Sequence, residues 1–453
     1  MPNALIRHGR TRSNTKRFGW ASKDAVQWLR LVVVLSSCML WAWPGSSAAA
    51  EETKHPSRLG FWEKSTRDAP APALTKEQQL QIEQLQAIGY VEGSEPGRDR
   101  SLIWVYDKEK TEPGLNLLVS GHRAEATLMG SDGEILHRWA YPFKAIWPRR
   151  NIPPLMSYWR RVDLQENGDL IAIYEGWGIV KVDANSQIVW TNPIRAHHDM
   201  QIMPDGRIYV LTRKARLVPE FNPSKPVLED FITILNAEGK LVESISVLAA
   251  IMNSPFRELY EEKAPAGAVG DVLHTNSLFV LDGRGSDRAR WLAPGNVLIS
   301  MRIPSLVAVV DLSQAKVVAM WSGSFRFQHD PKILDNGNLL LFDNGDPDKG
   351  PSSVVESDPI THQVKWRYRG SEEEPFFSRF CGAAQRLPNG NTLITESSQG
   401  RAFEVTQAKE IVWEYNSPHR VGDNREFVAS LLEVIRLPAE FPIEWAKPPE
   451  PEP

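Results

Sequence analysis

The sequence predicts an all-β fold, a six-bladed β-propeller with one short helix before it. Two units that recur along the chain carry this prediction. The first unit is a turn followed by an apolar strand, with copies NGDLIAIY (167–174), DGRIYVL (205–211), GNVLISM (295–301), NGNLLLF (336–342) and NGNTLIT (389–395). The second unit is a turn and a strand that usually ends in Trp, in six copies: DGEILHRW (132–139), NSQIVW (185–190), EGKLVES (238–244), AKVVAMW (315–321), HQVKW (362–366) and AKEIVW (408–413).

The spacing of these units favours blades around an axis. Copies of the second unit begin about 46 to 53 residues apart, except for one gap of about 77 that holds an insertion. Asn-Gly and Asp-Gly are strong hairpin signals because both residue types tolerate positive φ. One copy is too small to bury its own apolar face, so neighbouring copies must stack, as the four-stranded blades of a propeller do. We expect the Trp side chains to pack between blades.

Composition limits the function. The chain has 453 residues, 42% of them apolar, which is enough for a large core. Its formal net charge of -4 argues against nucleic acid as a main partner, because that would require a basic face. The only two cysteines, Cys38 and Cys381, cannot build a zinc site.

Residues 1–50 are typical of a signal peptide. A basic stretch precedes a mostly apolar run of 13 residues from Leu31 to Trp43, which is too short for an ordinary bilayer span. Ala48-Ala49-Ala50 offers small residues for cleavage before Glu51. We therefore expect export to the periplasm or the extracellular space, with an uncleaved membrane anchor as the alternative. Once the leader is removed, Cys381 has no internal disulfide partner.

The remainder divides into three expected parts. Residues 51–100 hold a polar, Pro-rich linker and one helix over 74–89, where Thr75 and Gln78 have capping-box spacing. Ile82 lies on the apolar stripe of that helix, and Leu80 lies off it. The propeller is expected over 101–440, and residues 441–453 form a Pro/Glu-rich tail.

Three histidines share one position in the repeat. His198 and His329 each lie eight residues before the glycine of the following turn. His274 lies eight residues before Asp282, where an inserted loop replaces the tight turn. Equivalent positions on the innermost strands of a propeller converge on its axis. These histidines are therefore expected to meet in one central funnel.

A second position points to the same place. Seven residues after the turn glycine come Arg213, Arg302 and Asn344, which should lie at the ends of the second strands. Arg160 and Gly382 occupy the histidine position in other blades. A cluster of histidines could bind a metal, or could place one imidazole as a nucleophile with the others as acid, base or electrostatic partners. The spacing alone does not choose between these.

Four short segments resemble the bacterial arylsulfate sulfotransferases that use no nucleotide sulfate donor. They are His197-His198-Asp199 before MQIMPDG, His274-Thr275-Asn276-Ser277, Leu298-Ile299-Ser300-Met301-Arg302, and His329-Asp330 before PKILDNGNLLLFDNG. The resemblance covers roughly residues 110–420. It implies a six-bladed propeller that passes a sulfuryl group from a phenolic sulfate ester to a phenolic acceptor through a transient sulfohistidine.

The resemblance also assigns roles. His329 matches the nucleophile, and His274, Asn276 and Arg302 match the residues that hold the sulfuryl oxygens. His197-His198 matches the first histidine element, and the repeat position favours His198 as the inward-facing one. Because a phenolate is a good leaving group, the resemblance implies no metal and no cofactor.

Two features depart from the family, and other functions stay open. Some exported members carry a disulfide, which this chain cannot form internally once the leader is removed. Residues 51–105 are too short for the β-sandwich domain that helps better-known members to dimerise, so the oligomeric state is open. A quinone-cofactor dehydrogenase, a non-catalytic propeller that binds a ligand or a partner, and a sulfatase that uses water as acceptor are the alternatives.

Overall fold

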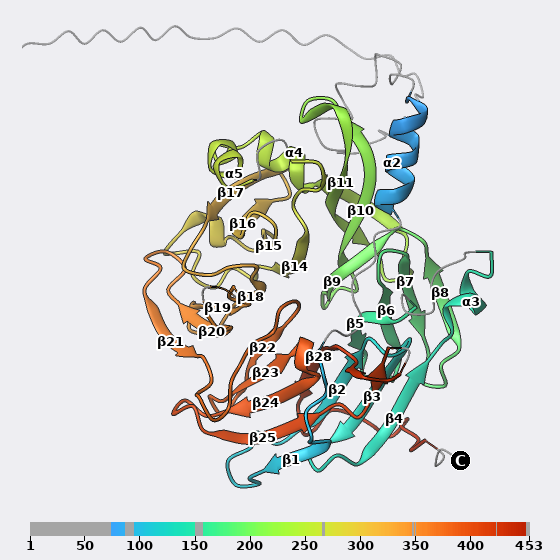
Figure 1. Ribbon diagram of the computed structural model, residues 1–453, viewed down its shortest axis with the longest axis vertical. Helices are drawn as coiled ribbons and strands as arrows, with labels where there is room; N and C mark the ends of the chain where they lie inside the picture. Colours follow the sequence, from blue (N-terminus) through green and yellow to red (C-terminus); the bar gives the residue numbers. More distant parts are fainter. Residues whose placement is uncertain are drawn as a thin grey trace, which may run out of the picture. The chain divides into compact units, whose positions relative to one another are not determined.

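The computed structural model describes residues 74–86, 95–149, 157–264, 268–346, 348, 350–422 and 424–449. All of them belong to one compact unit, Pro56–Pro453. Within these residues the strands form six sheets of four or five strands, which are the blades of a β-propeller, and one separate two-stranded pair (Figure 1). The structure therefore confirms the predicted fold class. The expected leader over 1–50 and linker over 51–73 lie outside the described residues.

Four blades use consecutive strands, with the innermost strand first. The first blade has β5 (Trp159–Leu164), β6 (Leu170–Tyr174), β7 (Gly178–Val182) and β8 (Ile188–Asn192). The second has β9 (Ala196–Ile202), β10 (Ile208–Val218), β11 (Asn222–Leu235) and β12 (Leu241–Ser246). The third has β14 (Thr275–Val280), β15 (Val297–Met301), β16 (Leu306–Asp311) and β17 (Lys316–Trp321). The fourth has β18 (His329–Ile333), β19 (Leu339–Asp343), β20 (Ser353–Ser357) and β21 (Val364–Tyr368).

The last two blades combine both ends of the propeller. The fifth blade has β22 (Ala383–Arg386), β23 (Thr392–Glu396), β24 (Arg401–Val405) and β25 (Ile411–Asn416), and β1 (Leu102–Tyr106) pairs along its outer edge. In the sixth blade, β28 (Leu431–Leu437) is the innermost strand beside β2 (Leu115–Ser120), β3 (Glu125–Gly130) and β4 (Ile135–Ala140). Pairing of β28 with β2 closes the ring, because it ties the late part of the chain to the early part.

Tryptophans of the second repeat unit bind the next blade, as the sequence predicted. Trp139 of the sixth blade is fully buried, and its Nε1–H donates to the carbonyl of Gly168 in the first blade at 3.0 Å. Trp366 of the fourth blade donates to Gln407 of the fifth at 3.1 Å. Trp413 of the fifth donates to Ser131 of the sixth at 2.8 Å. Each indole therefore has its donor satisfied across a blade interface, and those of Trp139 and Trp413 are also fully buried.

A buried arginine holds the fifth blade together. Arg401 in β24 is fully buried, with Nη2 2.8 Å from Glu414 and 3.4 Å from Glu374, and Nη1 3.3 Å from Glu396. Burial alone would lower the pKa of Arg401, but its hydrogen bond to Glu414 and the neighbouring carboxylates raise it. The cation offsets carboxylates that could not stay buried and charged alone.

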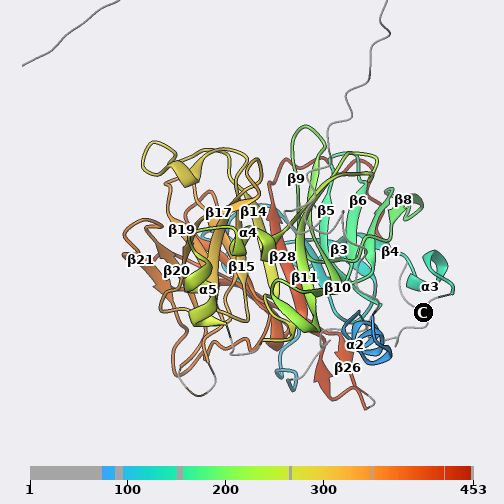
Figure 2. The same cartoon turned by 90° about the horizontal axis from the view of Figure 1, so that it is seen from above.

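The predicted N-terminal helix is α2 (Lys76–Gln86). Its capping box forms in both directions: the Gln78 N–H donates to Thr75 Oγ1 at 3.1 Å, and the Thr75 N–H donates to Gln78 Oε1 at 3.0 Å. Ile82 is buried against Ala215 and Leu228, so α2 packs on the long β10–β11 hairpin (Figures 1 and 2). Residues 87–89 of the predicted helix lie outside the described residues.

The insertion and the tail also pack on the propeller. The insertion after the second blade contains α4 (Val247–Met252), α5 (Arg257–Lys263) and the short strand β13 (Gly270–Asp271), which pairs in parallel with β11. Another short helix, α3 (Phe143–Ile146), follows the sixth blade's outer strand. In the segment predicted as a tail, Trp445 donates to the Glu166 carbonyl at 2.9 Å. Across the described residues, every helix is too short or too polar to cross a membrane.

Candidate active site

The innermost strands of the first four blades break their regular pairing near one end. The ladder shifts around Arg160 in β5, across 197–199 in β9, at Asn276 in β14, and after His329 in β18. A bulge leaves a residue unpaired and redirects its side chain. His198, His274 and Asp330 also have φ near +54°, +52° and +54°. Such backbone conformations are uncommon for residues other than glycine and are concentrated at functional sites.

The strand register corrects one part of the repeat argument. His198 and His329 each lie four residues before the last residue of their strand, β9 or β18. In the third blade, the residue at that position of β14 is Asn276, whereas His274 precedes the strand. The count from Asp282 was misleading because the inserted loop there is not equivalent to a turn glycine. His274 nevertheless reaches the cluster: its ring centroid lies 4.9 Å from that of His198.

The two histidines of the second blade are both buried and contact each other. Nδ1 of His197 lies 2.8 Å from Nδ1 of His198, and Nε2 of His197 lies 3.6 Å from Oδ1 of Asp230. The backbone N–H of His198 donates to Glu175 Oε2 at 2.9 Å. Burial, reinforced by the charge of Arg213 at His197 and by His274 at His198, holds the pKa of both rings well below 6.5. Both are therefore neutral at pH 7, and His198 is the one that contacts His274.

His329 is buried and is held in one tautomer by Asn344. The Asn344 Nδ2 group donates to the carbonyls of Ser378, at 2.9 Å, and Cys381, at 2.6 Å. Its Oδ1 atom therefore faces Nδ1 of His329, at 2.7 Å, and can only accept. His329 consequently carries its proton on Nδ1 and has its lone pair on Nε2. Burial, with the charge of Arg302, lowers the pKa of His329 well below 6.5, so the ring is neutral.

A carboxylate orients His274. Nδ1 of His274 lies 2.7 Å from Oδ2 of Asp271. The backbone N–H of His274 donates to Oδ1 of the same carboxylate at 3.0 Å. Asp271 reaches this place because β13 pairs with β11. Although burial opposes ionisation, His274 and Arg213 lower the pKa of Asp271. Burial and the charge of Asp271 raise the pKa of neighbouring Asp230.

Three arginines bring positive charge to the histidines. Arg302 is half-buried, with its guanidinium carbon 4.9 Å from the Phe327 ring centroid, and its backbone N–H donates to the His274 carbonyl at 3.1 Å. Arg160 and Arg213 are buried. Nη2 of Arg160 lies 3.5 Å from Sγ of Cys381. Sequence reasoning gave Arg160 and Arg213 no role, although both occupy the marked repeat positions; only the packing shows that their charges act on the histidines.

A family match covers this part of the chain. The family model described as Arylsulfotransferase (ASST) matches residues 162–418. The chain belongs to the arylsulfotransferase family. The match confirms the resemblance of the four segments, and it spans every candidate site residue predicted from the sequence. Membership supports an aryl sulfotransferase-type activity.

Solved structures similar to this arylsulfotransferase-family chain are distant. A protein of unknown function from Bacteroides caccae is 15% identical, covering 71% of this chain and 98% of its own, with a TM-score of 0.47. Virginiamycin B lyase from Staphylococcus aureus is 8% identical, covering 57% of this chain and 70% of its own, with a TM-score of 0.35. No curated protein matches the chain in sequence.

Asn276 links the third blade to the fourth. It is buried, and its Nδ2 group donates to the carbonyl of Gln328, at 2.9 Å, directly before His329. Because a primary amide has two N–H donors, one remains for a ligand. Asn276 therefore ties the third blade to the strand that carries His329.

A charged layer lies next to the histidines in this arylsulfotransferase-family fold. Asp199 accepts the N–H of Leu278 at 2.9 Å, and Asp330 accepts the N–H of Ala384 at 2.9 Å, so each carboxylate reaches the following blade. Arg161 pairs with Asp199 at 3.0 Å and also with Glu433. These contacts hold Asp199 beside His198 and Asp330 beside His329 in place.

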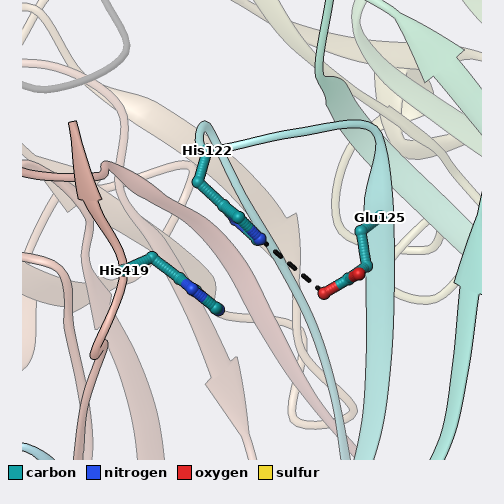
Figure 3. A group of neighbouring side chains, drawn as sticks. All are labelled: His122, Glu125 and His419. Atoms are coloured by element: carbon teal, nitrogen blue, oxygen red, sulfur yellow. Dashed lines mark ion pairs between the residues drawn. The ribbon is translucent and has the colours of Figure 1, made fainter. Parts of the chain in front are cut away.

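Two groups of described residues have the donor atoms of a metal site. Glu175, His197 and His198 form one group on the axis. His122, Glu125 and His419 form the other, where the sixth blade meets the connection from the fifth (Figure 3). The sequence prediction used neither His122 nor His419, because neither occupies the repeat position of the axial histidines.

Proposed function

We propose that this chain transfers a sulfuryl group from an aryl sulfate to a phenolic acceptor, with His329 as the covalent carrier. The observation that carries the proposal is the hydrogen bond from Nδ1 of His329 to Oδ1 of Asn344. It leaves a neutral imidazole whose Nε2 lone pair is available to attack. Covalent catalysis by such a group divides one difficult transfer into two easier ones.

The local charge suits an anionic donor. Arg160, Arg213 and Arg302 contribute three positive charges, whereas Glu175 and Asp271 contribute two negative ones while His197, His198 and His329 are neutral. A guanidinium offers a planar pair of donors to the oxygens of a sulfuryl group. Fixed donors in a buried site act strongly on charge that develops in the transition state. Arg302, which lowers the pKa of His329, is the arginine proposed to hold the transferred group.

In the first half-reaction, Nε2 of His329 forms a bond to sulfur while the bond from sulfur to the aryl oxygen breaks. The electron pair of the broken bond leaves on the phenolate. His274, hydrogen-bonded through Nδ1 to Asp271, is proposed to give a proton to that phenolate from Nε2. The carboxylate of Asp271 stabilises the protonated form of His274. His329 keeps its Nδ1 proton, which stays hydrogen-bonded to Oδ1 of Asn344.

In the second half-reaction the acceptor phenol replaces the first one. Its oxygen attacks sulfur as His274 takes the phenolic proton, and the bond from sulfur to Nε2 of His329 breaks. His329 returns to its neutral tautomer, and the product is a new aryl sulfate. Since the two phenols need not be bound together, initial-rate plots at several acceptor concentrations should give parallel double-reciprocal lines.

The test uses a chromogenic aryl sulfate with and without an added phenol. Wild-type protein should release the chromophore faster with the phenol and should form the sulfated acceptor. After quenching with donor alone, the peptide containing His329 should gain the mass of one SO₃. His329→Ala should release no chromophore in the first turnover, whereas the matched control His362→Asn, at an exposed position, should behave as wild type.

Other outcomes would identify the alternatives. If added phenol does not change the rate of chromophore release and inorganic sulfate is the product, the protein is a sulfatase. A bound quinone absorbance would indicate a dehydrogenase. Ligand binding without turnover would indicate a non-catalytic propeller. A full first-turnover burst from His329→Ala would assign the transfer to another nucleophile, with His274 the next candidate.

We also propose that the chain acts outside the cytoplasm. The basic and apolar pattern of residues 1–50 motivates this. N-terminal sequencing of protein from the native host should begin near Glu51; an intact leader in the membrane fraction would indicate an anchor, and an intact soluble cytoplasmic chain would contradict export.

A further inference from the structure

Three side chains of types that can ligate a metal meet where the propeller ring closes. His122 lies in the loop between β2 and β3, Glu125 is the first residue of β3, and His419 lies just before β26 (Arg420–Val421) in the connection that leads to β28. One donor atom from each lies within 4.8 Å of the others. Figure 3 shows the tip of the His122 ring directed at the Glu125 carboxylate, with His419 beside it. This group, the closure cluster, has no part in the axial site.

The closure cluster contains a buried nitrogen without a hydrogen-bond partner. Nε2 of His122 is buried and, among the residues that the structure describes, makes no hydrogen bond. It lies 3.7 Å from Oε1 of Glu125, which is too long for one. Nδ1 of the same ring is 2.5 Å from Oγ of Ser120. When Nδ1–H donates to that hydroxyl, Nε2 presents its lone pair toward the carboxylate, and this is the arrangement that a metal ion requires.

The second imidazole is close enough to join. The rings of His122 and His419 stack with centroids 3.6 Å apart and planes 7° from parallel. Two cationic rings would repel each other at this distance, so the stack favours at least one neutral ring. Parallel rings direct their lone pairs side by side rather than to one point. His419 is only half-buried, so it has room to turn about its side-chain torsions.

We propose that His122, Glu125 and His419 bind one divalent transition-metal ion, with Zn²⁺ as the best fit. Two imidazole nitrogens and one carboxylate oxygen are a three-ligand set that zinc uses when a fourth position is taken by water or another ligand. Bonds of about 2.0–2.2 Å in a tetrahedron place ligand atoms about 3.4 Å apart. The ligand atoms must therefore approach by roughly 1 Å or slightly more, which side-chain rotation supplies.

Two arginines, Arg123 and Arg138, bring positive charge to the ligand groups themselves. Arg123 pairs with Oε2 of Glu125 at 2.5 Å, but half of its side chain is exposed, so it can leave the carboxylate to a metal. Arg138 acts on His419 from the neighbouring strand β4. Both charges weaken binding of a dication, and we therefore expect an affinity below that of a typical structural zinc site.

A metal here would act as a clamp on the ring. It would join the β2–β3 loop of the early chain to the segment that delivers the closing strand β28. Binding to the folded state alone stabilises that state by mass action. The thermal unfolding temperature should therefore rise with Zn²⁺ concentration, independently of any sulfotransfer activity.

The test is a titration of the chelator-treated full-length protein with Co²⁺, whose visible absorption reports tetrahedral coordination. Wild-type protein should bind one equivalent, and Zn²⁺ should displace it. His122→Gln and His419→Gln should bind Co²⁺ more than about 100-fold more weakly, since loss of even an outer-shell partner typically costs about 10–100-fold. The control His362→Asn should be unchanged, and His198→Gln should retain the site.

Two results would overturn the proposal. One is the absence of Co²⁺ absorption and of any Zn²⁺-dependent rise in unfolding temperature in the wild-type protein. The other is binding that survives His419→Gln but is lost in His198→Gln, which would place the ion on the axis. If a glutamine variant does not fold by circular dichroism, wild-type protein decides the question: Zn²⁺ must protect His122 and His419 from diethylpyrocarbonate, and unprotected rings would refute the site.

Discussion

Asn344 fixes which nitrogen of His329 can attack, so Asn344→Leu tests the proposed nucleophile without removing it. Leucine has a similar volume but offers no acceptor to Nδ1–H and no donors to the carbonyls of Ser378 and Cys381. A buried hydrogen bond contributes about 0.5–1.5 kcal/mol net, and an unpaired buried partner costs about 1–3 kcal/mol. Loss of about 1.4–2.8 kcal/mol of preference for the productive tautomer and orientation should slow the first half-reaction by about 10–100-fold.

The assay is stopped-flow mixing of enzyme with excess chromogenic aryl sulfate and no acceptor. The amplitude of the burst should stay near one equivalent, while its rate constant falls. Asn296→Leu is the matched control, because it removes a side-chain donor to the carbonyl of Trp291, at 3.0 Å, at the end of the β14–β15 hairpin opposite His274. Its burst rate should stay within about twofold of wild type. A folded Asn344→Leu protein with a wild-type burst rate would refute the tautomer argument.

Three further outcomes are expected. Arg302→Ala should lower kcat by about 10²–10³, the usual cost of one preorganised donor, and steady-state kinetics within about twofold of wild type would place Arg302 outside the site. Because the pKa of His329 is well below 6.5, the ring gains a proton only in more acidic solution; the acidic fall in kcat/KM for the donor should therefore lie below pH 6.5, and a midpoint at or above 6.5 would contradict the assignment. Arg401→Met should lower the free energy of unfolding in urea by about 3–5 kcal/mol, because buried carboxylates lose their cation. Arg284→Met, which breaks an ion pair with an exposed aspartate, should cost no more than about 1 kcal/mol, and equal losses would contradict the burial argument.

Most of the fold could be predicted from the sequence, because each repeat contains the residues that its own turn and blade interface require. Turn glycines at Gly206, Gly337 and Gly390 have φ of +83°, +77° and +89°, a range that favours glycine, so their spacing marks the hairpins. The Trp at the end of a blade marks an interface, since an indole there is buried and bonded to the next blade. No turn residue or repeat in the sequence indicated that β28 would pair with β2 and close the ring.

The candidate site divides along the same line. Sequence position alone indicated that His198 and His329 occur at equivalent places, because a period of one blade brings equivalent residues to one axis. It misassigned the strand position of His274, since the insertion changed the count from the turn, although His274 does reach the cluster. Sequence position also could not assign Asp271 or Arg160. Asp271 is placed by the pairing of β13 with β11, and Arg160 contacts Cys381, which is far away in the chain.

By itself, then, the sequence determined the architecture, the family resemblance and the residue types on the axis, because repeats and motifs depend on residues close together in the chain. The tertiary structure decided what those residues can do. Only the packing of the fourth and fifth blades presents the Ser378 and Cys381 carbonyls to Asn344, and so determines that Nε2 of His329 carries the lone pair. Hydrogen-bond direction, burial and charge at a histidine depend on groups that folding brings together from distant blades.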